Sequence, residues 1–275
     1  MNFLKLCNDD PLLQMLIDIF NANPIRIPEY IIQPLSVFSK TTKNVKFIGT
    51  IKSLLADSTE MNIQVQESVM ANVSSTKTKA VDAKTGIEVM DGFLKGLGSN
   101  AASFEFAFKG VKKVSFAFEN ILRRYVDIGL LMKILTQRKV DVNNPVVKNF
   151  IDEVSECILV DSTITSNNFS IKVEKSSSAD FSFDLPEIQK VLQSQGNSLQ
   201  VMSSGTQEIS FKGEKQLAFA FTGFGIKVND DGTLYYEGEP DRMHLTRVPT
   251  ATPLEIQPTY LMLGDEVGLA EIEMD

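Results

Sequence analysis

The chain has few of the residues from which enzyme sites are built. Its 275 residues include one His, His244, and two Cys, Cys7 and Cys157. No Cys-x-x-Cys or His-x-x-x-His pair is present, so a zinc site is unsupported. Nothing in the sequence brings Cys7 beside His244 as a nucleophile and its base. We therefore predict that the protein is not an enzyme and holds neither a metal nor a diffusible cofactor.

Other absences concern location and solubility. Two Cys cannot form the disulfide framework of a small secreted domain, and the first residues are apolar too briefly for a secretory signal. No stretch approaches the roughly 18–20 consecutive apolar residues of a spanning helix. With 43% hydrophobic residues the chain can nevertheless build a packed core. A soluble resting protein in the reducing cytoplasm is expected.

Charge is unevenly distributed along the chain. The formal net charge is −8, and the stretch 250–275 has no Lys or Arg but contains Glu255, Asp265, Glu266, Glu271, Glu273 and Asp275. Basic residues instead gather in 109–139. This asymmetry suggests an anionic partner or a tail that covers a basic face. A solvated surface with a merely acidic terminus is the open alternative, and a pI near 4.9 argues against a nucleic-acid partner.

Helices are expected at four places. Asp10-Pro11 and Asn144-Pro145 are typical helix starts, because the first side chain caps free N–H groups and Pro in the first turn loses no needed donor. The predicted helices cover about 11–22, 122–135, 145–154 and 186–192.

Most other stretches show the alternation of strands. Two strands joined by a turn at Thr41–Asn44 are expected within 25–55. The polar stretch 58–91 shows no clear core face, and Gly92–Asn100 is interpreted as a loop. Further strands are predicted at 103–109, 115–119, 157–183 with turns at 166–168 and 176–178, 208–212, 217–228 with glycines 223 and 225 as bulge glycines, and, after an Asp230-Asp231-Gly232 hairpin turn, 234–236.

Several stretches carry a resemblance to a known family. They are Ile31–Lys40, Val126–Leu135 with Val142–Val147, Glu156–Asp161 and Leu217–Val228. Their order, over most of residues 8–236, resembles the pore-forming domain of the gasdermin family, and the size and tail resemble its bacterial members. The resemblance implies an α+β fold with a twisted, mainly antiparallel sheet and peripheral helices. It divides the chain into a pore-forming domain (1–238), a cleavable linker (239–252) and an autoinhibitory peptide (253–275).

The resemblance also implies a mechanism. A latent cytoplasmic monomer is cut by a protease, caspase-like or another and encoded nearby, which removes the peptide. Freed subunits bind anionic lipids of the inner membrane, extend two β-hairpins each and homo-oligomerise into a large β-barrel pore that kills the cell in antiphage defence. Segments near 58–118 and 158–213 can supply strands of the roughly 9–11 residues that a membrane requires.

The resemblance, together with the charge pattern and the irregular, Arg-containing composition after Gly238, suggests the site residues. Cys7 is expected to be palmitoylated, although a small buried residue is its open alternative, and Cys157 is expected in the core. Cleavage is expected between Asp241 and Thr252, near Arg242 and Arg247. The basic membrane-binding residues are expected to be Lys40, Lys43, Lys46, Lys109, Lys112, Lys113, Arg123 and Arg124. The autoinhibitory contacts are expected from Tyr260, Leu261, Leu263, Val267 and Leu269.

Two other readings remain open at this point. A soluble β-rich binding or scaffold protein could recruit a partner through its acidic tail, and it predicts no lipid binding after tail removal. An unrecognised hydrolase would need His244 or a carboxylate pair in a pocket.

Overall fold

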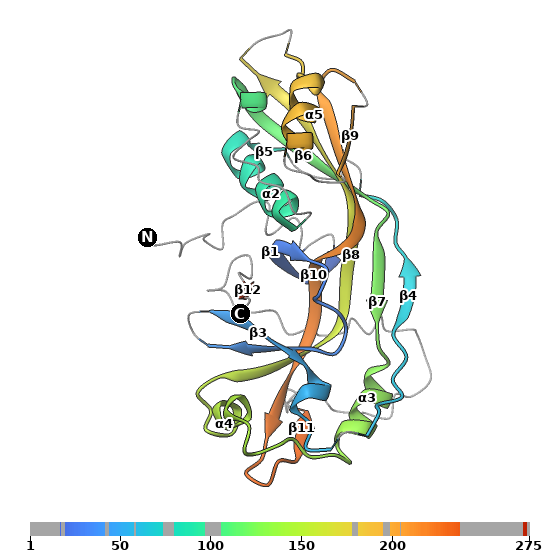
Figure 1. The fold of residues 1–275 in the computed structure, drawn as a ribbon, viewed down its shortest axis with the longest axis vertical. Coiled ribbons are helices and arrows are strands. Elements are labelled where there is room, and N and C mark those ends of the chain that lie inside the picture. Colours follow the sequence, from blue (N-terminus) through green and yellow to red (C-terminus); the bar gives the residue numbers. More distant parts are fainter. Residues whose placement is uncertain are drawn as a thin grey trace, which may run out of the picture.

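Two long strands form the spine of the molecule. Strands β8 (Glu156–Ser176) and β10 (Glu208–Val228) have 21 residues each and pair antiparallel along their length (Figure 1). Typical strands have only about five or six residues. Because β8 and β10 are much longer, several shorter strands pair with successive parts of this spine. The structure is a computed structural model, and it describes residues 17, 20–41, 44–57, 59–73, 80–96, 106–177, 181–194, 199–203, 205–236 and 272–273.

The upper sheet is the part of the spine at the top of Figure 1. Strand β6 (Val111–Glu119) pairs with the C-terminal part of β8, and β5 (Val81–Asp82) pairs with β6. Strand β9 (Gln200–Ser203) pairs with the start of β10.

The middle of the spine carries three further strands. Strand β7 (Leu122–Tyr125) pairs with β8 and holds β4 (Gln66–Val69) on its other side. Strand β1 (Asn23–Glu29) pairs with the centre of β10.

The lower sheet completes the topology. Strand β2 (Ser36–Lys40) pairs with the start of β8, β3 (Val45–Thr50) pairs with β2, and β11 (Leu234–Tyr236) pairs with the end of β10. Strand β12 (Ile272–Glu273) lies parallel to β3, whereas the other named pairs are antiparallel. This arrangement confirms the twisted, mainly antiparallel sheet with peripheral helices.

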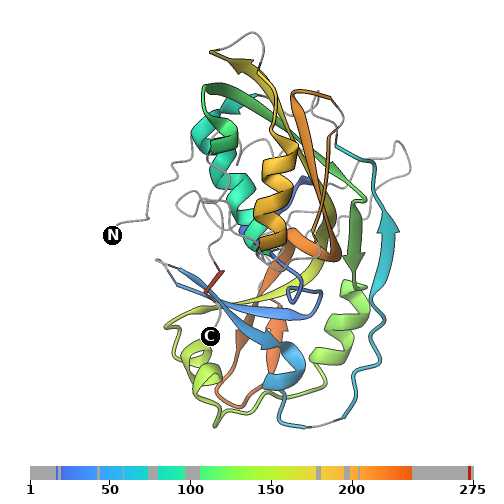
Figure 2. The same cartoon turned by 45° about the horizontal axis from the view of Figure 1, so that its top comes forward.

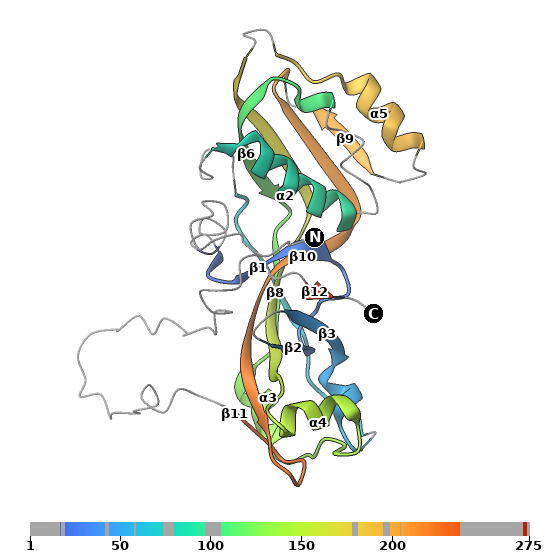
Figure 3. The same cartoon turned by 90° about the vertical axis from the view of Figure 1, so that its left-hand side faces the viewer.

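Helices cover the sheet at both ends. Helix α2 (Ala83–Gly96) and helix α5 (Leu185–Ser194) lie on one side of the upper sheet (Figure 2). Figure 3 shows α3 (Ile128–Leu135) and α4 (Pro145–Ile151) at the lower end, near the short 3-10 helix η1 (Ile51–Leu54). No helix in the described parts of the chain is both long and apolar enough to cross a membrane.

The core follows the same division. One apolar cluster packs α2 against β6, β8 and β10 in the upper sheet, and a second packs α3, α4 and η1 against the lower sheet. A third, smaller cluster joins β1, β2 and the spine. Between them β8 carries a buried polar stretch that comprises Asp161, Ser162, Thr163, Thr165, Ser166 and Asn168.

Several predicted elements are confirmed. The β2–β3 hairpin, α3, α4, α5 and the turn before β11 occur where the sequence places them. The Oδ1 atom of Asn144 accepts a hydrogen bond from the Val146 amide at 2.9 Å, as expected of a helix cap. The ladder shifts register at Gly223, as expected of a bulge glycine.

The predicted turn at 166–168 is wrong, because β8 continues through it. The Ser166 hydroxyl bonds locally with the backbone of Asn168, and a distant segment adds further hydrogen bonds. The Ser166 hydroxyl donates to the Glu119 carbonyl at 2.6 Å, and the Asn168 amide donates to the Glu119 carboxylate at 2.6 Å. Strand β10 is likewise continuous from 208 to 228, with a bulge between Lys212 and Leu217.

The predicted loop at Gly92–Asn100 is also wrong up to Gly96, because α2 occupies that stretch. Leu122 lies in strand β7 rather than in a helix, and residues 106–108 form a helical turn rather than a strand. Phe181 and Phe183 lie outside any strand. Most of the helix expected near 11–22 falls outside the described residues.

Candidate functional site

The upper sheet has one wholly apolar face. Paired residues of β6, β8 and β10 form three rows across the strands, and every member is buried. The rows are Val114 with Val173; Phe116, Ile171 and Ile209; and Phe118, Phe169 and Phe211.

Helix α2 covers this face. Met90, Phe93 and Leu94, spaced at i, i+3 and i+4, are buried on its inner side. The Phe93 ring stacks on Phe169 with centroids 5.0 Å apart. A Cβ at Gly86 would lie 2.2 Å from a methyl carbon of Val114, so glycine permits the close approach of helix and sheet.

The opposite face of the same strands is polar. The Ser115 hydroxyl donates to a carboxylate oxygen of Glu174 at 2.6 Å, and the Lys172 ammonium lies 3.4 Å from the same oxygen. The hydroxyls of Ser170 and Ser210 are 2.8 Å apart. Alternation along each strand therefore separates an apolar face under a helix from a polar face.

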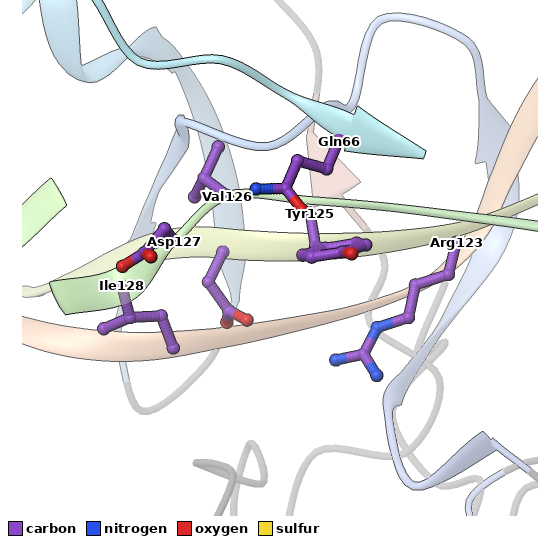
Figure 4. A pocket seen from close by; sticks show the side chains of 7 residues that line it. Gln66, Arg123, Tyr125, Val126, Asp127 and Ile128 are labelled. Atoms are coloured by element: carbon purple, nitrogen blue, oxygen red, sulfur yellow. The ribbon is translucent and has the colours of Figure 1, made fainter. Parts of the chain in front are cut away.

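A pocket lies beside β8 in the middle of the spine (Figure 4). Asp161 is 4% exposed, and the Thr222 hydroxyl donates to its carboxylate at 3.0 Å. Burial raises the pKa of the Asp161 carboxyl, and the Thr222 hydrogen bond and the charge of Arg123 oppose this only in part. The pocket has a volume of about 320 Å³ and is lined by Gln66, Arg123, Tyr125, Val126, Asp127, Ile128 and Asp161.

We expect Asp161→Asn to stabilise the protein at neutral pH but not in acid. Below the ordinary carboxyl pKa, Asp161 is protonated in both the folded and unfolded states. As pH rises toward the raised pKa of the folded state, Asp161 ionises readily only in the unfolded state. Ionisation therefore favours unfolding of the wild type, whereas the variant, which has no carboxyl group at this position, keeps its stability. Denaturant unfolding of both proteins between pH 4 and pH 8 measures this growing difference. Asp230→Asn, in an exposed turn, controls for the lost negative charge, and a pH-independent difference would contradict the assignment.

The expected membrane-binding residues are spread along the spine. Lys40 forms an ion pair with Glu156 at 3.0 Å at one end of β8, whereas Lys113 is opposite Lys175 at the other. At about 3.3 Å per residue these ends are about 60 Å apart along the strand, so they form no single cluster. Lys109 and Lys112 lie near Lys113 and are exposed, and Lys46 lies on β3.

Arg123 and Arg124 lie on β7 and are engaged within the fold. The Arg123 Nε atom donates to the Ser162 hydroxyl at 3.0 Å, and its guanidinium lies 5.8 Å from the centre of the Tyr125 ring. Arg124 forms an ion pair with Glu67 at 3.1 Å. Lys43 lies outside the described residues.

The described end of the tail lies on a sheet edge. Strand β12 pairs Ile272 with Val45 and Glu273 with Lys46 on the outer side of β3. An acidic position of the tail is thus opposite a basic position of the sheet. The other expected functional positions, Cys7, Arg242, Arg247, Tyr260, Leu261, Leu263, Val267 and Leu269, fall outside the described residues.

Sequence reasoning missed α2 and the Asp161 pocket. The helical spacing of Met90, Phe93 and Leu94 is the signal that could have revealed α2. Asp161 could have been noticed as the one acidic residue between Cys157 and Val173, a stretch rich in Ile, Val and Thr.

Comparison with known proteins agrees with this architecture. The model of the Bacterial Gasdermin Family matches residues 25–233. Gasdermin bGSDM from Vitiosangium sp. (strain GDMCC 1.1324) is 28% identical over 273 residues, which cover 98% of this chain and 99% of the relative. The structure of a bacterial gasdermin from Bradyrhizobium tropiciagri shares the fold, with a TM-score of 0.64 at 13% identity and coverage of 98% and 99%. The chain therefore belongs to the bacterial gasdermin family, a family of pore-forming rather than enzymatic proteins.

Proposed function

We propose that the protein is a latent pore former that its C-terminal residues restrain and that proteolysis releases. The observation that carries this proposal is the apolar face of the upper sheet, buried under one helix. Alternating strands with one apolar face are suited to a membrane, where lipid-facing and water-facing positions alternate along each strand. If α2 leaves, lipid can take its place against the Phe, Ile and Val rows.

Strand length supports the same proposal. Strand β6 has nine residues, and the parts of β8 and β10 that form the rows belong to still longer strands. About 9–11 tilted residues cross a hydrocarbon core. Unpaired strand edges are not tolerated in lipid, so copies of the chain must close into a β-barrel ring to satisfy their backbones.

The position of β12 supports restraint by the tail. An uncovered edge strand readily pairs with another chain, and β12 occupies the outer edge of β3. In this proposal residues 253–275 restrain the domain formed by 1–238, and a protease cuts within 239–252, near Arg242 or Arg247. Removal of the tail frees the edge and begins assembly.

The remaining parts of the proposal concern the membrane. The latent monomer is cytoplasmic, and the cut form enters the inner membrane and kills the cell in antiphage defence. A palmitoyl group on Cys7 supplies one membrane signal, and basic residues facing anionic lipid supply a second, because one acyl chain alone binds only marginally. The protease, caspase-like or another, is encoded nearby.

Dye release from anionic liposomes tests the proposal. A protease site engineered near residue 247 allows the same protein to be assayed before and after cutting. We expect release at background from the uncut protein and at least tenfold more from the cut protein. The uncut protein is the first control. Protease-treated wild type, which lacks the engineered site, is the second and excludes an effect of the protease itself. Absence of release, with the tail shown to have dissociated, would contradict pore formation and favour a soluble binding protein.

A further inference from the structure

The Asp161 pocket lies where one edge of β8 changes its partner strand. Strand β2 pairs with the start of β8, and β7 pairs with its middle. Between these two strands, the Leu35 amide donates to the Val160 carbonyl at 2.8 Å, and the Val126 amide donates to the Asp161 carbonyl at 3.0 Å. The backbone of β8 is therefore satisfied at this point, and the pocket adjoins the Asp161 side chain.

On its other edge, β8 has a bulge at the same position. Ser162 is opposite Thr222 and Val160 is opposite Gly223, so Asp161 is an extra residue without a partner on β10. A bulge re-aims the side chain of the extra residue, and bulges often lie beside functional sites. The interruption of the ladder explains how the Asp161 carboxylate comes to line the pocket.

The Asp161 carboxylate is buried but only partly hydrogen-bonded. Its Oδ2 atom accepts the hydrogen bond from Thr222. Apart from the amide of Asp161 itself, no other group in the described part of the chain donates to this carboxylate. The nearby Arg123 contributes its charge, but its Nε atom donates to Ser162. A buried carboxylate has room for several hydrogen bonds, so a cavity beside an oxygen without a donor points to a ligand that supplies one.

The charges around the pocket indicate the charge of that ligand. Asp127 and Asp161 are acidic and Arg123 is basic, so the ionised lining has an excess of one negative charge. One Asp127 oxygen caps α3 by accepting from the Leu130 amide at 2.8 Å, and the charge of Asp127 remains beside the pocket. An ionised Asp161 without a ligand also costs stability, and a bound cation would offset that cost.

The rest of the lining indicates an organic cation. Tyr125, Val126 and Ile128 provide a ring and two aliphatic side chains (Figure 4). Calcium takes six to eight oxygen ligands, and no group of three His, Cys, Asp or Glu suited to a metal ion occurs among the residues that the structure describes. An ammonium ion with a carbon body matches a mostly apolar pocket that has a few polar groups.

We infer that the Asp161 pocket binds a small primary ammonium compound with a short apolar body. Asp161 accepts hydrogen bonds from the ammonium group, and the charge of Asp127 adds attraction. The carbon body lies against Tyr125, Val126 and Ile128. The inference goes beyond pore formation and does not depend on it, because the pocket is present in the resting protein.

Methyl NMR of the full-length, uncut protein tests the inference, with butylammonium chloride as the probe at pH 8. The methyl signals of Val126 and Ile128 should shift in a saturable manner. n-Butanol, which has the same carbon body without the charge, should cause no saturable shift. Sodium chloride at the same concentration controls for ionic strength.

Three variants locate the binding site. Asp161→Asn should weaken binding by about tenfold or more, because it removes the charge from a charge-assisted hydrogen bond. Asp127→Asn keeps an equally good helix cap, and it should weaken binding by about threefold, because the lost attraction is that of an exposed charge. Asp230→Asn removes a negative charge from an exposed turn and should bind like the wild type.

Each outcome decides the inference. Saturable shifts with butylammonium that Asp161→Asn loses and Asp230→Asn keeps would support it. Absence of a saturable shift, equal shifts with n-butanol, or undiminished binding by Asp161→Asn would overturn it. The comparison of the two probes on the wild type stays decisive even if a variant does not fold. Dye release is a separate measurement, so failure of this inference leaves the proposed function intact.

Discussion

Oxidised Gly86→Cys/Val114→Cys protein is expected to release no dye after tail removal and to begin releasing it when a reductant is added. A disulfide between these positions fastens α2 to β6. If lipid must replace α2 on the apolar face, a fastened helix keeps the face covered. Release should fall from that of the cut wild type to background, and reduction should restore most of it.

The geometry suits a disulfide. A Cβ at position 86 lies 3.6 Å from the Cβ of Val114, within the roughly 3.5–4.5 Å that a disulfide requires. The substitution of Val114 also removes the methyl carbon that would clash. Native Cys157 should not interfere, because burial raises the pKa of its thiol to about 12 and leaves it unreactive.

A second disulfide provides the control. Gly110→Cys/Ser177→Cys joins the ends of β6 and β8, with Cβ atoms 4.0 Å apart. These strands are neighbours before insertion and stay neighbours in the proposed hairpins, so oxidation should leave release intact. Gly110 has a φ of +82°, which a Cys adopts with strain, so this variant should be somewhat less stable. Its disulfide does not attach α2 to the sheet. Equal release from oxidised and reduced Gly86→Cys/Val114→Cys protein would show that α2 need not leave.

Phe169→Ala is expected to destabilise the resting protein by about 3–5 kcal/mol. The Phe169 ring is fully buried and lies 5.0–5.5 Å, centre to centre, from the rings of Phe93, Phe116 and Phe118. Its removal leaves a cavity beneath α2 that these rigid rings cannot fill. Denaturant unfolding measures the change.

The adjacent residue gives a matched comparison. Ser170→Ala, on the polar face, removes the hydrogen bond with Ser210 and should reduce stability by about 1 kcal/mol. Similar losses for the two variants would mean that the Phe rows are not the main support of the upper sheet.

The sheet could be predicted from local alternation, whereas α2 could not. In β6 and the end of β10, Phe alternates with polar or small residues; β6 keeps that period, whereas β10 shifts register between Ala218 and Ala220 and again at Gly223. In α2, Gly86 and Gly92 interrupt the helical pattern, and Ile87 and Val89, together with Val81 just before the helix, imitate alternation. Tertiary packing on the Phe rows stabilises this helix, so its own sequence is a weak guide.

Long-range partners explain the other differences. Ser166–Asn168 has the composition of a turn, and hydrogen bonds to the distant residues Glu119 and Gly213 help to hold it in a strand. Leu122 is at a helical spacing from the apolar residues that follow it, but its pairing with Thr165 on β8 places it in a strand. The basic residues could be found by counting charges, whereas their separation along β8 depends on strand pairing that no local pattern contains.

Many paired strands are far apart in the sequence, and this separation determines the order in which strands can pair while the chain is being synthesised. Strand β1 is among the first elements made, yet its partner is the centre of β10, so it must wait for nearly the whole sheet. Such non-local pairing makes folding slow. Roughly 40 residues lie between the end of β10 and β12, and at 5–20 residues per second the ribosome adds them in about 2–9 s. If β12 restrains the molecule as proposed, it emerges within seconds of the last strand of the sheet, and a nascent copy has little time in which the sheet is folded and the β3 edge is uncovered.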